Sequence, residues 1–267
     1  GQTGTQGLSV AADLTLSGTN TYTGGTTVNA GTLTAASAGA LSSGAVTVNG
    51  GALSLGTAVS GVGVVTLAGG AISGSGSLSG TAYDVRSGTV SAVLAGSGIA
   101  LTKSTNGTVT LSGQNTYTGG TTVSAGTLAL GHATNTLADS GAVAVSGGTL
   151  DLGSNSDTVG ALTLTQGSII GTGTLTPTGT ITANVSATAS VSAKLGGSAA
   201  LSKSGAGNLT LSADNSGWAG TVALSAGGLL VGNDKALGTG AATLSGGALS
   251  SDSATARTLA NLSLIHI

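Results

Sequence analysis

The chain has 267 residues, of which 50 are glycine and 5% are charged, with no cysteine and a formal net charge of −2. A charge near zero argues against nucleic acid as a partner, because Lys and Arg at phosphates supply most of that affinity. The lack of cysteine excludes disulfides and thiolate metal sites, and four aromatic residues cannot build the thick core of an ordinary globular domain.

The composition favours an ordered β protein over a disordered chain. Disordered chains combine low hydrophobicity with high net charge and many prolines, whereas this chain has one proline and a mean hydropathy of +0.43. No run of 18 apolar residues is present to span a membrane as a helix. Abundant glycine opposes helices, and the many Thr, Val, Leu and Ile residues favour strands.

Short alternating apolar segments, each followed by a glycine-containing turn, recur along the chain. In Leu14–Leu16, Val46–Val48 and Leu162–Leu164, apolar side chains alternate with Thr, so one face is apolar. Strand–turn–strand elements recur every 19 to 22 residues within a copy, at 28–33, 48–53, 67–72, 123–128, 145–150, 164–169, 224–229 and 244–249. This pattern predicts an all-β fold, a parallel β-helix with coils of about 20 residues. Roughly thirteen coils at about 4.8 Å would make a rod of about 60 Å, with apolar columns inside and Thr, Ser and Asn ladders outside.

A longer repeat is superimposed on the short one. Segment 14–33, "LTLSGTNTYTGGTTVNAGTL", returns at 109–128 as "VTLSGQNTYTGGTTVSAGTL" and more loosely at 209–230 as "LTLSADNSGWAGTVALSAGGLL". We therefore expect one β-helical segment over 1–261, with units at about 14–108, 109–208 and, in part, 209–261. The ending "LSLIHI" at 262–267 departs from this style and is interpreted as a non-native tail.

Segment 101–128, "LTKSTNGTVTLSGQNTYTGGTTVSAGTL", resembles the autotransporter-associated β-strand repeat, also called the passenger-associated transport repeat. The resemblance also covers 14–33 and 201–230. It implies a right-handed β-helix in the passenger of a type V secreted protein of a Gram-negative bacterium. It further implies display at the cell surface, after export through a C-terminal β-barrel translocator that is the natural partner and absent from this chain. Assistance to export or folding of the passenger is implied as well.

The aromatic residues of the repeat leave two interpretations. Tyr22, Tyr117 and Trp218 could form a row of exposed rings that stack on sugars, or they could pack over the small Gly-Gly turns beside them. Packing is the favoured interpretation. In the third copy the aromatic residue stands one position later than in the others, which we interpret as drift.

The sequence predicts no catalytic, cofactor-binding or metal-ligating residues. Asp151 and Asp157 are neighbouring acids, but turn aspartates usually bond their own backbone. His132 and His266 have no partner histidine. Lys103 and Lys203 precede Ser as in a phosphate loop, yet the required glycines are missing.

Two classes of function remain. We expect a non-enzymatic stalk that supports export and folding and mediates adhesion or self-association, since low net charge leaves little repulsion between rods. The alternative is a fragment of a carbohydrate-binding or polysaccharide-acting β-helix protein whose active site lies outside this segment. Ice binding would need paired Thr columns, and the expected Thr columns are single. No small-molecule substrate is evident.

Overall fold

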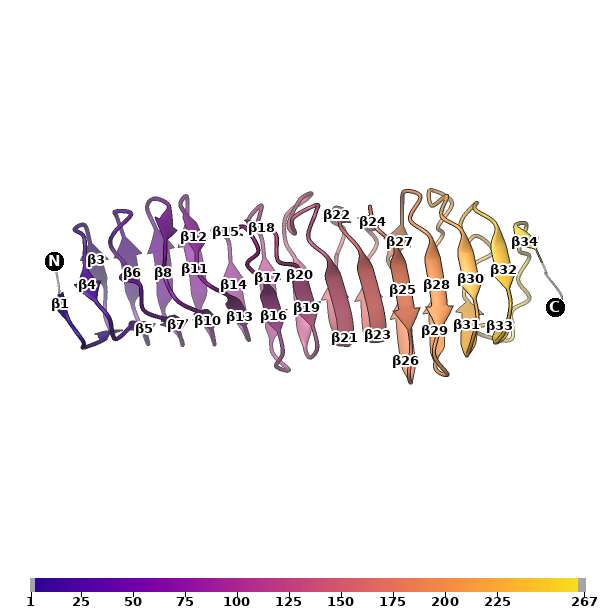
Figure 1. Ribbon diagram of the computed structural model, residues 1–267, viewed down its shortest axis with the longest axis horizontal. Coiled ribbons are helices and arrows are strands. Elements are labelled where there is room, and N and C mark those ends of the chain that lie inside the picture. Colours follow the sequence, from indigo (N-terminus) through magenta and orange to yellow (C-terminus); the bar gives the residue numbers. More distant parts are fainter. Residues whose placement is uncertain (1–2, 264–267) are drawn as a thin grey trace.

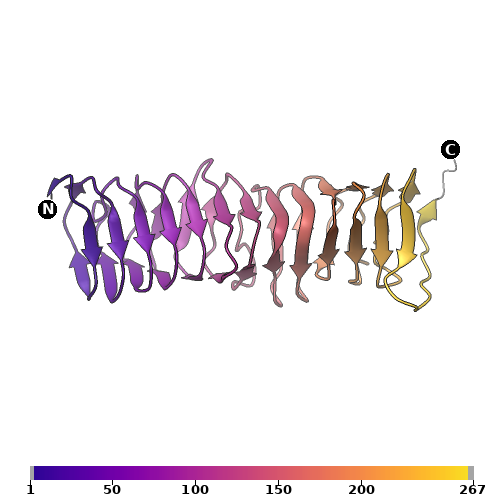
Figure 2. The same cartoon turned by 90° about the horizontal axis from the view of Figure 1, so that it is seen from below.

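A computed structural model of the chain describes residues 3–263, which form an elongated rod of stacked β coils (Figure 1). The described residues contain strands, turns and bends but no helix, and hence no helix able to cross a bilayer. Seen from below, the coils follow one another along a single axis from the N-terminal to the C-terminal end (Figure 2). The predicted parallel β-helix is confirmed.

Two columns of parallel strands run the length of the rod within one 25-stranded sheet. The first column contains β2 (Leu8–Val10), β5 (Thr26–Val28), β7 (Val46–Val48), β10 (Val65–Leu67), β13 (Tyr83–Val85), β16 (Leu101–Lys103), β19 (Thr121–Val123), β25 (Ile181–Asn184), β28 (Leu201–Ser204), β30 (Val222–Leu224), β32 (Ala242–Leu244) and β34 (Leu262–Ser263). The second contains β3 (Leu14–Leu16), β6 (Thr32–Ala35), β8 (Ala52–Leu55), β11 (Ala71–Gly74), β14 (Gly88–Val90), β17 (Thr108–Leu111), β20 (Thr127–Leu130), β26 (Thr188–Val191), β29 (Asn208–Leu211), β31 (Gly228–Val231) and β33 (Ala248–Ser251). The longer strands β21 (Val143–Asp151) and β23 (Leu162–Ile170) pass through both columns.

The strand register reproduces the spacing expected from the sequence. In the two long columns, paired residues lie from 18 positions apart (Val65 and Tyr83) to 22 positions apart (Thr121 and Val143). Alternate residues of each strand point inward, and the inward Val, Leu and Ile side chains form one continuous buried cluster. A thin core thus extends along the whole rod, because every coil adds its few apolar side chains to those of its neighbours.

Polar side chains form the expected ladders on the outside. Thr27, Thr47 and Thr66 are stacked in register on the first column. Beside them, Asn49 Nδ2 donates to Asn29 Oδ1 at 2.8 Å. On the second column, Ser190 Oγ bonds Ser168 Oγ at 2.9 Å. The outer face is therefore a regular, mostly uncharged array of hydroxyl and amide groups.

A third column of short strands is interrupted along the rod. It consists of three separate groups: β1 (Thr3–Gly4) with β4 (Thr21–Tyr22); β9 (Val59–Ser60), β12 (Ser77–Ser79), β15 (Val93–Gly96) and β18 (Thr116–Tyr117); and β22 (Asp157–Val159), β24 (Thr174–Pro177) and β27 (Lys194–Leu195). The first two groups are each followed by a coil with a strandless loop in place of a third strand, at 36–45 and 131–142. After the third group comes a coil with only the isolated bridge of Trp218, and then two strandless loops, at 232–241 and 252–261. We call the loops 36–45, 131–142 and 232–241 the lid loops. The interruptions recur once per long repeat.

The tail interpreted as non-native falls mostly outside the described residues. Residues 264–267, including His266, lie beyond the part of the chain that the structure describes. Leu262 and Ser263 form β34, whose residues pair with Ala242 and Thr243 of β32. The first two residues of this segment thus continue the first column.

Candidate functional site

The three repeat segments, 14–33, 109–128 and 209–230, each mark the end of one group of third-column strands. Tyr22 lies in β4 and Tyr117 in β18, the last strands of their groups. Trp218, in the coil after β27, forms an isolated parallel bridge with Gly197, which lies two residues after the end of β27. The long repeat therefore coincides with a structural boundary that recurs every five coils, about 24 Å along the rod.

All three repeat aromatics are buried, so the sugar-stacking interpretation is wrong. Tyr22 is 2% exposed, Tyr117 1% and Trp218 0%. Each one pairs with a glycine of the preceding coil, namely Gly4, Gly96 and Gly197. The favoured packing interpretation is therefore supported: all three rings are buried, and a Cβ on Gly220, in the turn beside Trp218, would lie 2.4 Å from Trp218 Nε1.

The shift of the aromatic in the third copy is compensated by one extra residue, Gly217. Asn215 makes the same kind of contacts as Asn115, and Trp218 pairs with a glycine of the preceding coil as Tyr117 does. Two residues separate Asn215 from Trp218, whereas one residue separates Asn115 from Tyr117. The interpretation of this shift as drift is therefore wrong. The aromatic ring returns to the same place in the solenoid.

The polar atom of each aromatic has a dedicated partner. Tyr22 Oη and Thr26 Oγ1 are 2.5 Å apart, and Tyr117 Oη and Thr121 Oγ1 are 2.7 Å apart. In the third copy Val222 replaces this threonine, and Trp218 Nε1 donates instead to Ala199 O at 2.8 Å. The two substitutions are coupled, because an indole N–H that bonds a carbonyl leaves no need for the hydroxyl.

Glycine beside the aromatic is required by close approach between coils. A Cβ on Gly119 would lie 2.5 Å from Gly98 O, and one on Gly220 would lie 1.9 Å from Ala199 O and 2.4 Å from Trp218 Nε1. In the second copy the next residue, Gly120, also has a φ of +90°, which favours glycine. The Gly-Gly turn thus lets the coil pass close to the one before it.

Loss of the tyrosine–threonine bond gives a measurable prediction. Tyr117→Phe keeps the ring and removes the hydroxyl, so Thr121 Oγ1 loses a buried partner. We expect the free energy of unfolding of the surrounding coils to fall by about 1 kcal/mol. Native-state hydrogen exchange measures this change. A tyrosine in place of Trp218 would not form the corresponding bond, because Val222 stands where Thr121 stands in the second copy and has no hydroxyl. An unchanged exchange profile would contradict the assignment.

A buried asparagine in each repeat segment links neighbouring coils. Asn115 Oδ1 accepts from Leu94 N of the preceding coil at 2.9 Å, and its Nδ2 donates to Thr136 O of the next at 2.6 Å. Asn215 accepts from Leu195 N at 2.8 Å and donates to Ala236 O at 2.7 Å. Asn20 donates to Ala40 O at 2.8 Å. In every copy the amide holds down the lid loop of the following coil, and we call these three residues the asparagine clamps.

Two buried lysines accompany the second and third segments. Lys103 and Lys203 are 0% exposed and occupy inward positions that pair with the aliphatic residues Val123 and Leu224. Lys203 Nζ donates to Ser204 O at 2.9 Å, Gly205 O at 3.0 Å and Ala226 O at 3.0 Å, and Lys103 Nζ to Thr105 O and Ala125 O. Burial lowers the pKa of both amines. Each ammonium fastens its own turn to that of the next coil.

Asp157 binds the second lid loop from the coil that follows it. Its Oδ2 accepts from Leu137 N at 2.8 Å, and its Oδ1 from Thr158 N at 3.0 Å. Burial, with a smaller contribution from the Asp139 charge, raises the pKa of Asp157 to about 6, although the backbone donors oppose the shift. The expected turn bond to its own backbone holds for Asp151, which accepts from Gly153 N at 2.8 Å. For Asp157 this expectation was incomplete, because its Oδ2 accepts from Leu137 N of the preceding coil in addition to the bond of its Oδ1 with Thr158 N.

The raised pKa of Asp157 sets a pH dependence. Because the pKa is above its unfolded value near 3.8, the unfolded chain loses this proton first as pH rises, so stability falls between about pH 4 and 6. The loss is of order 1–2 kcal/mol after solvent screening. Hydrogen exchange of 131–142 between pH 4.5 and 7, corrected for intrinsic rates, measures it. Asp139→Asn should reduce the loss, and local stability that rises over this range would contradict the assignment.

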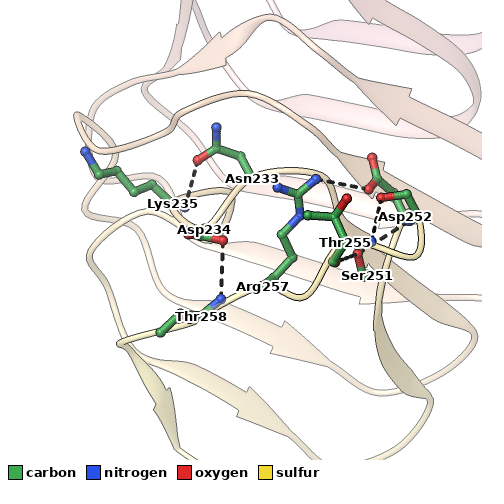
Figure 3. A network of polar contacts seen from close by, with 9 residues as sticks. Asn233, Asp234, Lys235, Ser251, Asp252, Thr255, Arg257 and Thr258 are labelled. Carbon is green, nitrogen blue, oxygen red and sulfur yellow. Dashed lines mark hydrogen bonds and ion pairs between the residues drawn. The ribbon is translucent and has the colours of Figure 1, made fainter.

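The third lid loop is bonded to the coil that follows it (Figure 3). Asp234 Oδ1 accepts from Thr258 N at 3.3 Å, and Asn233 Oδ1 accepts from Lys235 N at 2.9 Å. Nearby, Arg257 Nη2 and Asp252 Oδ1 are 3.5 Å apart. These exposed bonds shape the loop surface, whereas the buried clamp Asn215 anchors it from below.

No catalytic cluster emerges from the described residues. Within 3–263 there is no group of three or more His, Cys, Asp or Glu side chains that could hold a metal. His132 lies in the second lid loop, where a 2.6 Å bond joins its Nδ1 to Thr134 O. The exposed acids accept bonds from backbone amides: Asp13 accepts from Thr32 N of the next coil, and Asp214 accepts from Ser216 N of its own turn. The polar groups of the repeat segments therefore serve the connections between coils.

The clamps and buried lysines were not identified from sequence. We expected Asn in the outer ladders, and Lys103 and Lys203 were considered only for a phosphate loop whose required glycines are missing. The available signal was position: Asn precedes the aromatic in all three segments, and Lys103 and Lys203 follow an alternating pattern that places them inward. An inward polar residue repeated at one position indicates a buried bond.

Comparison with known proteins identifies the repeat. The passenger-associated-transport-repeat family model matches three segments, residues 11–35, 101–130 and 201–231. The search among curated proteins found no match, and the search among solved structures found none either. The three matched segments contain the clamps and the buried aromatics described above. The chain therefore carries three copies of the repeat that occurs in autotransporter passengers.

Proposed function

We propose that this chain, a segment of an autotransporter passenger, is a stalk that supports export and folding of the passenger and presents it at the cell surface. The observation that carries the proposal is the recurrence, every five coils, of a buried clamp that bonds the coils before and after it. A module whose buried groups all serve coil stacking suits a rod-building function. The natural partner would be the translocator of the same protein, outside this segment.

Support for an export and folding function comes from the dependence of the clamps on both neighbouring coils. A single coil buries little apolar area, and its stability depends on the coils on either side. The clamp leaves a buried donor and acceptor unpaired unless both neighbouring coils are in place. Coils that fold in succession would therefore be stabilised at each module, which favours a rod growing from one end.

Support for adhesion or self-association comes from the outer surface. Of the basic residues, Arg86, Lys235 and Arg257 are paired with aspartates, and Lys103 and Lys203 are buried. Little charge remains to keep two rods apart. The Thr, Ser and Asn ladders present aligned donors and acceptors along the rod.

Surface display of the full-length parent tests the proposal. Asn115→Ala combined with Asn215→Ala should reduce the amount of passenger that reaches the cell surface and resists protease there. Deletion of one whole unit, 109–208, is the control, because it removes five coils and retains the register. Display that is unaffected by loss of both clamps would contradict the export function.

Settling of cells that display the parent tests the surface function separately. Faster settling than that of empty-vector cells is expected. Equal settling at equal display would remove self-association and leave the stalk in place.

A further inference from the structure

Asparagine is followed by glycine at two places in the chain, Asn49-Gly50 and Asn106-Gly107. This dipeptide is chemically reactive, because a glycine has no Cβ to keep its backbone nitrogen away from the side-chain amide carbon of the preceding asparagine. Both asparagines are exposed, and both stand in turns that follow first-column strands, β7 and β16. The same dipeptide therefore stands in two different surroundings on one rod.

The turn that contains Asn106 leaves the reacting groups without hydrogen bonds. Within residues 3–263, no acceptor or donor is bonded to the Asn106 side chain, and Gly107 N has no acceptor. In the third copy, by contrast, Ala206 stands at this position, and Gly207 N donates to Val185 O at 2.8 Å. The second copy thus combines the reactive dipeptide with an unbonded glycine nitrogen.

Asn49 is held in place where Asn106 is not. Its Nδ2 donates to Asn29 Oδ1 at 2.8 Å, and its backbone nitrogen donates to Val28 O at 2.8 Å. The Asn49 side chain must therefore leave the outer ladder before its amide carbon can meet Gly50 N. Breaking one ordinary hydrogen bond slows such a step by about fivefold.

Coil stacking fixes the length of the main chain at Asn106. The buried Lys103 ammonium is bonded to the carbonyl just before Asn106, and Gly107 O accepts from Thr127 N of the next coil at 3.2 Å. Between these two contacts, Gly126 of the next coil lies so close that an added Cβ would be 2.7 Å from Asn106 C. A main chain that is longer here by one carbon atom cannot keep both contacts.

We propose that Asn106 deamidates spontaneously and thereby loosens the joint between the coil of β16 and β17 and the coil of β19 and β20. Gly107 N attacks Asn106 Cγ to form a five-membered succinimide, and the side-chain amide nitrogen leaves as ammonia with the proton that Gly107 N loses. Water then opens the ring. Attack of water at Cγ gives aspartate, whereas attack at the backbone carbonyl gives isoaspartate, in which the main chain passes through Cγ.

Isoaspartate is the product that changes the rod. It lengthens the main chain by one carbon atom, so the bond from Thr127 N to Gly107 O should be lost. Aspartate adds the same negative charge on a main chain of ordinary length and should leave this bond in place. The inference goes beyond the proposed stalk, because it concerns the chemistry of the chain itself.

Mass spectrometry of the purified chain, kept in mildly alkaline buffer, tests the site. Conversion of the amide to a carboxylate, located by fragmentation, is expected about fivefold faster at Asn106 than at Asn49 in the folded rod. In urea, which removes the ladder, the two sites should react at similar rates. Asn106→Ala copies the third repeat, so it should abolish the reaction there and leave the thermal midpoint unchanged. A folded rod in which Asn49 reacts as fast as Asn106, or faster, would overturn the inference.

Hydrogen exchange tests the consequence. The isoaspartate form, separated by chromatography, should lose protection at Thr127, while the Asn106→Asp protein should keep it. Unchanged Thr127 protection in the isoaspartate form, or an equal loss in Asn106→Asp, would show that main-chain length does not loosen the joint. Both measurements use the isolated chain, so their failure leaves the stalk proposal standing, and failed surface display leaves them interpretable.

Discussion

Trp218→Ala is expected to lower the free energy of unfolding of the C-terminal coils by about 3–5 kcal/mol, the usual range for a buried Trp truncated to Ala. Trp218 is 0% exposed and is the largest fully buried side chain of the described core. Its ring fills the space beside Gly220 and Gly238, where an added Cβ would approach the indole at 2.4 Å and 3.0 Å. Hydrogen exchange of residues 195–245 measures the loss.

Trp218→Phe is the matched control for the ring. It keeps most of the apolar volume and removes the bond from Nε1 to Ala199 O, so a loss of about 1–2 kcal/mol is expected. A Trp218→Ala protein as stable as Trp218→Phe would contradict the account of the aromatic as a core-filling residue.

Asn115→Ala is expected to lower local stability by about 3 kcal/mol. The substitution leaves Leu94 N without its side-chain acceptor and removes the donors to Gly113 O and Thr136 O, at 3.1 and 2.6 Å. Each buried polar group left unpaired costs about 1–3 kcal/mol. The effect should appear in two coils, since the lost partners lie in the coils before and after the clamp.

Asn29→Ala is the control for the clamp. Asn29 is exposed and bonds Ser9 and Asn49 in the outer ladder, so its replacement should change stability by less than about 0.5 kcal/mol. Asn115→Ala and Asn29→Ala proteins of equal stability would show that the repeated asparagine is an ordinary ladder residue.

The coil architecture was predictable because alternation is a local property. Val46, Thr47 and Val48 show by themselves which side chains face inward, and the recurrence near 20 residues places the next coil on top. The apolar columns and the outer Thr and Asn ladders follow from these two facts. Burial of Tyr22, Tyr117 and Trp218 was also favoured, since a Gly-rich coil has room for one large ring.

The clamps, the buried lysines and the interruption of the third column required knowledge of neighbouring coils. Whether Asn115 faces inward depends on a free N–H at Leu94 and a free carbonyl at Thr136, about 21 residues away on either side. Likewise, Gly217 appears as a drift in the alignment until the pairing of Trp218 with Gly197 is known. Local periodicity carries no information about such contacts between coils.

Hydrogen exchange of the Asn115→Ala protein tests most directly the claim that the transport repeat is a module for joining coils. The account predicts faster exchange at Leu94 and throughout the lid loop 131–142, in the coils on both sides of the clamp, with unchanged protection five coils away around Asn215. Protection that stays unchanged at both Leu94 and the lid loop, or a loss confined to residue 115 itself, would contradict the account.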